Sequence, residues 1–290
     1  MAKNKLKSDF QKLISSGKKI FSNRNQLKRL SNINLLDGIE DLYNISSDSF
    51  LIIEIGANDG MMNDRFYEFI IKNDPNAIFV EPIPDYYEAL KNNYINNKNS
   101  VFVNAAIDIE ISNKEMHYIP YQTILDKKVK FRMEQTPEFQ SQHWAMGLGT
   151  FHPTKNNIAC PELSFFRKKI NVKTITFNYL FNKYKLYKYD NIVIQTDCEG
   201  HDYMILKTFP FEKIKPKVYI SEIFSNIRYP ESHPNYTGPG GEGYIQEQGL
   251  YTKSEEEDAK NIFKKYDYSL FRNNDLIALD KSILQLVQLK

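Results

Sequence analysis

The sequence predicts an α/β fold: a doubly wound, Rossmann-like, mainly parallel sheet that ends in an antiparallel C-terminal hairpin. From Phe50 onward, short apolar runs alternate with helical segments, and this alternation builds parallel sheets with helices on both faces. The first run, FLIIEI, is apolar almost throughout, as expected for a strand buried on both faces. A glycine-containing turn follows it directly. With 41% hydrophobic residues, the 290-residue chain can build a sizeable core, which excludes a mainly disordered protein.

The first 48 residues differ from the rest of the chain. They are rich in Lys, Asn and Ser, and their apolar residues, such as Leu6, Phe10 and Leu13, recur at helical spacing. The apolar face is thin for a membrane-surface helix. We therefore expect residues 1–48 to be an N-terminal helical extension, packed on the main domain or on a second copy of the chain, and residues 49–290 to be that domain.

The strands and helices of the domain follow from apolar periodicity and turn signals. Apolar runs predict parallel strands at 50–55, 77–80, 101–104, 192–194 and 217–223. Helices are predicted at 61–72, 84–94, 202–208 and 254–266. The last helix has a capping box in which Ser254 is the cap and Glu257 follows three residues later. Two closing strands, at 268–271 and 276–279, flank a polar Asn-Asn-Asp turn.

Two stretches interrupt this alternation, at 113–170 and 225–252. The first has little periodicity, and the second contains five of the chain's 12 glycines. Both follow predicted strands, where a doubly wound sheet places its ligand crevice. We expect both stretches to be insertions that border that crevice.

Charge and cysteine usage narrow the function classes. A net charge of +2 disfavours a dedicated nucleic-acid binder, which is normally more basic. The two cysteines exclude a disulfide scaffold, and no CxxC metal pair is present. No apolar run is long enough to span a membrane, and the basic start does not have the pattern of a secretory signal. A cytoplasmic location is expected.

The first chemical signal is the turn Glu54-Ile-Gly-Ala-Asn-Asp-Gly60, directly after the first strand. Gly56 lets the chain turn sharply and lets a ligand approach the backbone, and Gly60 relieves crowding where the next helix begins. A nicotinamide dinucleotide site needs GxGxxG, which is missing here. Asn58 and Asp59 stand where a phosphate would bind, and Asp59 would repel it. The turn therefore favours a cationic ligand without phosphate, although an ordinary tight turn is the alternative.

The second signal is Glu81, at the tip of the second strand and followed by Pro82. An acidic residue there, about 20 residues beyond the glycine turn, accepts hydrogen bonds from ribose hydroxyls in doubly wound nucleotide-binding folds. The alternative is a solvated carboxylate at a strand end. Because Glu81 follows the glycine turn at this spacing, the ribose-binding role is favoured.

The third signal is a dense polar set after the fourth strand: Asp197, Glu199, His201 and Asp202. Asp197 or His201 can take a proton from a substrate hydroxyl, and the carboxylates can also hold a divalent cation. Asp202 fits the start of a capped helix. We expect no metal, because the ligand spacing is not convincing.

Several segments in order resemble the FkbM-type family of class I S-adenosylmethionine-dependent methyltransferases. They span roughly residues 50 to 280: LIIEIGANDG, IFVEPIPDYYEAL, VNAAI, INVKTITFNYLF, IVIQTDCEGHDYMIL and DYSLFRNNDLIAL. The GANDG turn and the DxEGxD element are fairly specific to the family. The chain departs from the family pattern at Gln195, where a lysine is usual, and at His201.

The resemblance implies S-adenosylmethionine as cofactor and assigns residues to it. Glu54 and Gly56 correspond to positions near its methionine part, and Glu81 to the ribose-binding acid. The remaining cofactor positions are Asn58, Asp59 and Gly60 in the turn, Pro82 beside the ribose acid, Asn104, Ala105 and Ala106 near the adenine, and Asp197. Asp197, Glu199 and His201 are the candidate catalytic residues.

Methyl transfer to a hydroxyl of a saccharide-type or natural-product acceptor is the function that the resemblance implies. The two insertions would then form the acceptor pocket, with residues 235–250 closing on the acceptor. A nicotinamide-dependent oxidoreductase, a nucleic-acid methyltransferase and a non-catalytic binding protein with a similar fold are the alternatives. The expected partners are a small-molecule or saccharide acceptor, no nucleic acid, and a second copy of the chain through the N-terminal extension.

Overall fold

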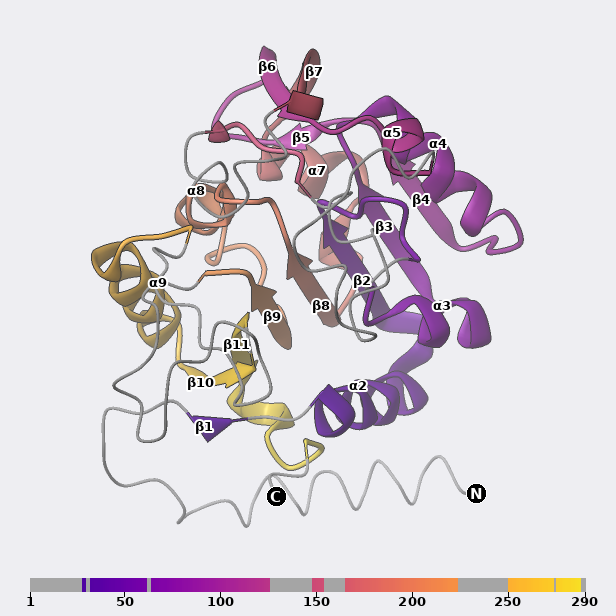
Figure 1. The fold of residues 1–290 in the computed structure, drawn as a ribbon. Helices are drawn as coiled ribbons and strands as arrows, with labels where there is room; N and C mark the ends of the chain where they lie inside the picture. Colours follow the sequence, from indigo (N-terminus) through magenta and orange to yellow (C-terminus); the bar gives the residue numbers. More distant parts are fainter. Residues whose placement is uncertain are drawn as a thin grey trace, which may run out of the picture.

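A central, mainly parallel sheet organises the computed structural model, which describes residues 28–29, 32–61, 64–125, 148–153, 165–223, 250–273 and 275–287. Within these residues the sheet has eight strands in the order β1-β10-β11-β9-β8-β2-β3-β4 (Figure 1). Their bounds are β1 Lys28–Arg29, β2 Phe50–Ile55, β3 Asn76–Val80, β4 Ser100–Val103, β8 Asn191–Thr196, β9 Val218–Ser221, β10 Tyr268–Asn273 and β11 Asp275–Asp280. Strands β4, β3, β2, β8 and β9 run parallel, whereas β11 pairs antiparallel with both β9 and β10. The predicted mainly parallel sheet with an antiparallel C-terminal hairpin is confirmed.

Strand β2 shows why the apolar runs form the centre of the sheet. All six of its residues are buried. Successive side chains point to opposite faces, so Leu51 and Ile53 join one core cluster while Phe50 and Ile52 join the other. A strand between two helical layers must be apolar on both faces.

Helices cover both faces of the sheet. On one face pack α2 (Asn32–Ser46), α3 (Tyr67–Asn73) and α4 (Pro84–Asn93). On the other pack α7 (Phe177–Lys183), α8 (Asp202–Thr208) and α9 (Lys253–Lys265). Short 3-10 helices lie at Ser47–Ser49, Leu186–Lys188 and Lys281–Ile283. No helix in the described ranges is long and apolar enough to cross a membrane.

The described part of the N-terminal extension is a core element. Leu35, Ile39 and Leu42 of α2 are at most 2% exposed and pack in the same cluster as β2. Strand β1 extends the sheet beside β10. The predicted helical positions at Leu6, Phe10 and Leu13 lie outside the described residues.

Two predicted helix starts are wrong. Helix α3 begins at Tyr67 rather than at residue 61, because the Asp64 carboxylate accepts the Phe66 N–H at 2.7 Å in a turn that precedes the helix. The capping box of α9 uses Thr252 and Glu255, not Ser254 and Glu257. Thr252 has the extended backbone of a cap residue, whereas Ser254 already lies within the helix.

Part of the first predicted insertion is ordered as a second sheet, so the expectation of an irregular 113–170 stretch is wrong there. Three strands pair in the order β5 (Ala106–Ile107), β7 (Lys168–Ile175) and β6 (Asn113–Tyr118). Strand β6 is polar on one side and buries Met116 and Tyr118 on the other, which the sequence NKEMHY hardly reveals. Helix α5 (Tyr121–Leu125) follows. Most of the second insertion, including 235–249, lies outside the described residues.

Candidate active site

One cavity lies at the carboxyl ends of the parallel strands, where the strand order reverses between β2 and β8. Its empty volume is about 1060 Å³ with the open mouth included. The turn after β2, the segments after β3 and β4, and the loop after β8 meet there, together with Met116 of β6 and with Gly149 and Phe151. Its described walls comprise Glu54–Asn58, Asp64, Val80–Ile83, Tyr86, Ala105–Ile107, Met116, Gly149, Phe151, Gln195, Asp197–Glu199 and His201.

At Gly56, the chain that follows β2 lies directly against the backbone that follows β8. Gly56 has a φ of +79°, and a Cβ at this position would lie 1.9 Å from the Asp197 carbonyl oxygen. The position that a side chain at Gly56 would occupy is thus filled by the protein's own backbone. A Cβ at Gly60, which has a φ of +68°, would lie 2.4 Å from Leu90 of α4 and 2.5 Å from Tyr94, which follows α4. Gly60 therefore relieves crowding as expected, but against these side chains and not at the start of α3, which begins only at Tyr67.

Glu81 connects the two turns that frame the cavity. Its Oε2 accepts the Asn58 N–H and its Oε1 accepts the Ile83 N–H, both at 2.8 Å. The side chain is 3% exposed. Burial raises the pKa of Glu81 to about 8; the hydrogen bonds from Ile83 and Asn58 oppose this rise, and the charge of Asp59 adds to it.

Glu54 is a buried acid with an unsatisfied oxygen. It is 2% exposed, and its Oε1 has no hydrogen-bond partner. Burial raises its pKa well above the ordinary value, and the nearby Asp64 carboxylate raises it further. Beside it on β8, Gln195 also has a buried side-chain oxygen, Oε1, without a partner. Both unsatisfied oxygens belong to residues that line the cavity, so this end suits a ligand that donates hydrogen bonds.

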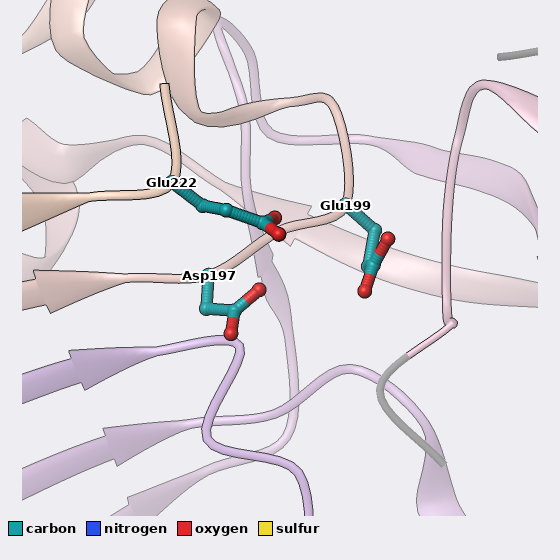
Figure 2. Close-up of side chains that lie close together, drawn as sticks. All are labelled: Asp197, Glu199 and Glu222. Atoms are coloured by element: carbon teal, nitrogen blue, oxygen red, sulfur yellow. The ribbon is translucent and has the colours of Figure 1, made fainter. Parts of the chain in front are cut away.

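Three carboxylates converge beyond β8 and β9. Asp197, Glu199 and Glu222 point toward one another, and one ligand oxygen of each lies within 4.8 Å of the others (Figure 2). Asp197 is solvent-accessible through the cavity. The protein atoms packed around it nevertheless raise its pKa to about 7, and the charges of Asp202 and Asp275 contribute, while a hydrogen bond from Glu222 opposes the rise. Burial and the neighbouring carboxylates hold the pKa of Glu222 well above its ordinary value.

His201 is buried at the start of α8 and is 4% exposed. Both of its ring nitrogens are engaged: Nε2 lies 3.2 Å from Asp108 Oδ1, and Nδ1 lies 3.3 Å from His152 Nε2. Burial lowers the pKa of His201 to about 4, although Asp108 opposes this shift, so the ring is neutral at pH 7. Lys114 completes the group with an ion pair of 2.9 Å to Asp108.

Comparison with known families decides the assignment. A model of the methyltransferase FkbM domain matches residues 54–269, well over half of the chain. The chain belongs to the FkbM methyltransferase family. No curated protein and no solved structure matched the chain.

In this FkbM methyltransferase, most of the predicted site residues reach the cavity. Those that line it are Glu54, Gly56, Asn58, Glu81, Pro82, Ala105, Ala106, Asp197, Glu199 and His201. The other three do not line it. Asp59 is fully buried and accepts the Met61 N–H, Gly60 packs on α4, and the Asn104 amide donates to the carbonyl oxygens of Glu81 and Pro82.

Other residues of the FkbM methyltransferase site were missed. Glu222 directly follows β9, but the sequence predicts a strand over 217–223 that includes it, so the strand-tip argument that selected Glu81 and Asp197 did not reach it. Asp108, Met116, Gly149 and Phe151 had no such signal, because they come from or beside the second sheet. Among the side chains of the two insertions that an acceptor could contact, His143, Trp144, Tyr236 and Tyr244 lie outside the described residues.

Proposed function

We propose that this protein is an S-adenosylmethionine-dependent methyltransferase with a Rossmann-like methyltransferase fold, and that it methylates a hydroxyl group. The observation that carries the proposal is the polarity of the cavity. One end is acidic, with Glu54, Asp64 and Asp197. The other is largely apolar, with Ile83, Ala106, Met116 and Phe151. A ligand with a cationic group at one end and a flat base at the other matches both.

The residues present fit S-adenosylmethionine. The unsatisfied Glu54 Oε1 would accept a hydrogen bond from the ammonium group of the methionine part. Glu81 would accept hydrogen bonds from the ribose hydroxyls through lone pairs that its two backbone donors leave available. Pro82, Ala105 and Ala106 would contact the base.

A phosphate-containing cofactor fits poorly. Five acidic residues are among the described wall residues of the cavity, Glu54, Asp64, Glu81, Asp197 and Glu199, whereas none of those wall residues is Lys or Arg. A pyrophosphate would find no cationic side chain among those wall residues to neutralise its charge. This argues against the nicotinamide-dependent alternative.

The chemistry divides between cofactor and protein. S-adenosylmethionine supplies an electrophilic methyl group on a sulfonium, so the protein must orient the acceptor and remove its proton. Asp197 is the proposed proton acceptor, because a base with a pKa of about 7 is half ionised at neutral pH. Glu222, whose pKa burial and the neighbouring carboxylates raise, would donate a hydrogen bond to the ionised form of Asp197. Glu199 faces the same point and would bind an acceptor hydroxyl.

His201 is the less favoured base, since Asp108 and His152 already engage its two ring nitrogens. For the acceptor we propose a neutral, hydroxyl-rich molecule of the saccharide type, because the described walls of the cavity carry no Lys or Arg that would bind an anionic one such as a nucleic acid. The cysteine usage agrees with a reducing, cytoplasmic location.

Isothermal titration calorimetry tests the cofactor assignment. S-adenosylhomocysteine should bind saturably, and NAD should not bind. Methyl transfer from radiolabelled S-adenosylmethionine to a panel of sugars and glycosides then tests the acceptor class. The proposed function is rejected if the folded protein binds NAD but not S-adenosylhomocysteine.

A further inference from the structure

The segment Leu148–Pro153, called here the 148–153 segment, closes the apolar end of the cavity. Its backbone pairs with β6 through His117, with bonds of 2.8 and 2.9 Å to Thr150. Thr150 is fully buried, and its hydroxyl donates to the Glu199 carbonyl oxygen at 2.8 Å. Two residues of the segment, Gly149 and Phe151, line the cavity. The predicted first insertion therefore supplies wall to the same cavity as the cofactor residues.

Gly149 permits the close approach of this segment to the cofactor side. A Cβ there would lie 2.5 Å from Ile83 Cδ1, and Ile83 follows the ribose acid Glu81 by two residues. Met116 of β6, which is 5% exposed, completes the wall. Gly149, Ile83, Met116 and Ala106 thus border an apolar part of the cavity, called here the slot, which suits the flat faces of a purine.

His201 and Asp108 hold Phe151 in place. The Phe151 and His201 rings meet edge to face at 5.1 Å between centroids. Asp108 fixes the His201 ring through Nε2, and His152 engages Nδ1. Lys114, paired with Asp108, lies 4.7 Å from the centre of the Phe151 ring. One network of contacts thus joins the residue after β5, strand β6, the start of α8 and the 148–153 segment around this ring.

We propose that Phe151 packs against the adenine of the cofactor, and that His201, oriented by Asp108, is a positioning residue for Phe151. This inference rests on the proposed function, because it takes the ligand to be an adenosyl compound. It gives His201 a role other than proton transfer. It also assigns part of an insertion to the cofactor, while acceptor binding would fall to other segments.

A local fluorescence reporter tests the contact. The chain has a single tryptophan, Trp144, so Trp144→Phe combined with Phe151→Trp places one indole at the slot. Adenosine and S-adenosylhomocysteine should both change its emission saturably, since stacked bases perturb an indole, and methionine should not. An indole that responds to methionine but not to adenosine would overturn the proposal.

The positioning role is tested in the same reporter background. His201→Asn and Asp108→Asn should each raise the Kd of adenosine and of S-adenosylhomocysteine alike, by about three- to ten-fold, the loss expected when one aromatic contact is misplaced. His117→Asn is the matched control, because it keeps the backbone bonds to Thr150 and should leave both Kd values within two-fold.

Urea unfolding of each variant separates stability from affinity. If both variants lower the urea midpoint but keep Kd within two-fold, the network only stabilises the fold and the positioning role is wrong. Asp108→Asn nearly preserves side-chain shape and provides a second variant if His201→Asn does not fold. Calorimetry of the unmodified protein with S-adenosylhomocysteine judges the proposed function separately. Binding there together with a silent reporter would reject this inference alone.

Discussion

Replacing Gly56 by alanine should be among the most damaging single changes in this protein. At φ +79°, a residue with a Cβ is strained by about 1–2 kcal/mol. The added Cβ would also lie 1.9 Å from the Asp197 carbonyl oxygen and 2.9 Å from its carbonyl carbon. These are backbone atoms, so no side-chain rotation can relieve the contact, and the end of β8 must move.

Overpacking of this kind typically costs about 1–3 kcal/mol, so the free energy of unfolding should fall by about 2–5 kcal/mol in total. Urea denaturation followed by circular dichroism measures this change. S-adenosylhomocysteine affinity should fall as well, because Asp197 is displaced. Gly38→Ala is the control. Its Cβ would lie 2.7 Å from Val287 Cγ2, which is a side-chain atom. Gly38 sits inside α2, where alanine gains about 1 kcal/mol of helix propensity, so the free energy of unfolding should fall less than in Gly56→Ala. A Gly56→Ala protein within 1 kcal/mol of the wild type, with unchanged ligand affinity, would refute the close approach of β2 and β8.

Four further predictions concern the charged groups. Because the pKa of Glu81 is raised from 4.5 to about 8 on folding, its contribution to stability is fully present below pH 4.5 and is lost as pH rises through 8. Glu81→Gln should remove this loss, which amounts to up to about 5 kcal/mol in the free energy of unfolding, and an unaltered pH dependence of unfolding would contradict the prediction. Turnover should rise with pH through about 7 as Asp197 loses its proton. Asp197→Asn should reduce turnover about 100-fold or more and abolish that rise. If the variant keeps the pH dependence of turnover, Asp197 is not the base. Glu54→Gln should weaken S-adenosylhomocysteine binding by about 1.5–3 kcal/mol in calorimetry yet spare adenosine, which lacks the ammonium group; equal losses for both ligands would indicate a structural defect instead. EDTA should leave activity intact, and a loss restored by Mg²⁺ would show that the cluster of Asp197, Glu199 and Glu222 holds a metal.

Local sequence patterns were sufficient to predict most strands of the parallel sheet. A strand between two helical layers must be apolar on both sides, so runs such as FLIIEI at 50–55 identify themselves. The carboxyl ends of parallel strands share one edge of the sheet, so the sequence places Glu81 and Asp197 at one site. Glu222, which completes the carboxylate group in Figure 2, was missed because the strand predicted at 217–223 extends past it, whereas β9 ends at Ser221.

Helix starts were less predictable, because several residues in a row can act as caps. Thr252 and Ser254 are both suitable cap residues with a glutamate three positions on. The backbone conformation selects Thr252, and that conformation depends on where Tyr251 enters the core. Strand β6 was missed because only Met116 and Tyr118 face the protein.

By itself, the sequence determined the mainly parallel sheet, the glycine turn after β2, and the acids at the strand tips, because each depends on residues that are neighbours in the chain. Only the tertiary structure decided which distant groups meet. Asp108 and His201 are 93 positions apart, and His152 and His201 are 49 apart. No local periodicity encodes such pairs, because their contact requires the second sheet to fold over the end of the first. The same holds for Gly56, whose missing side chain is explained only by the backbone of Asp197 beside it.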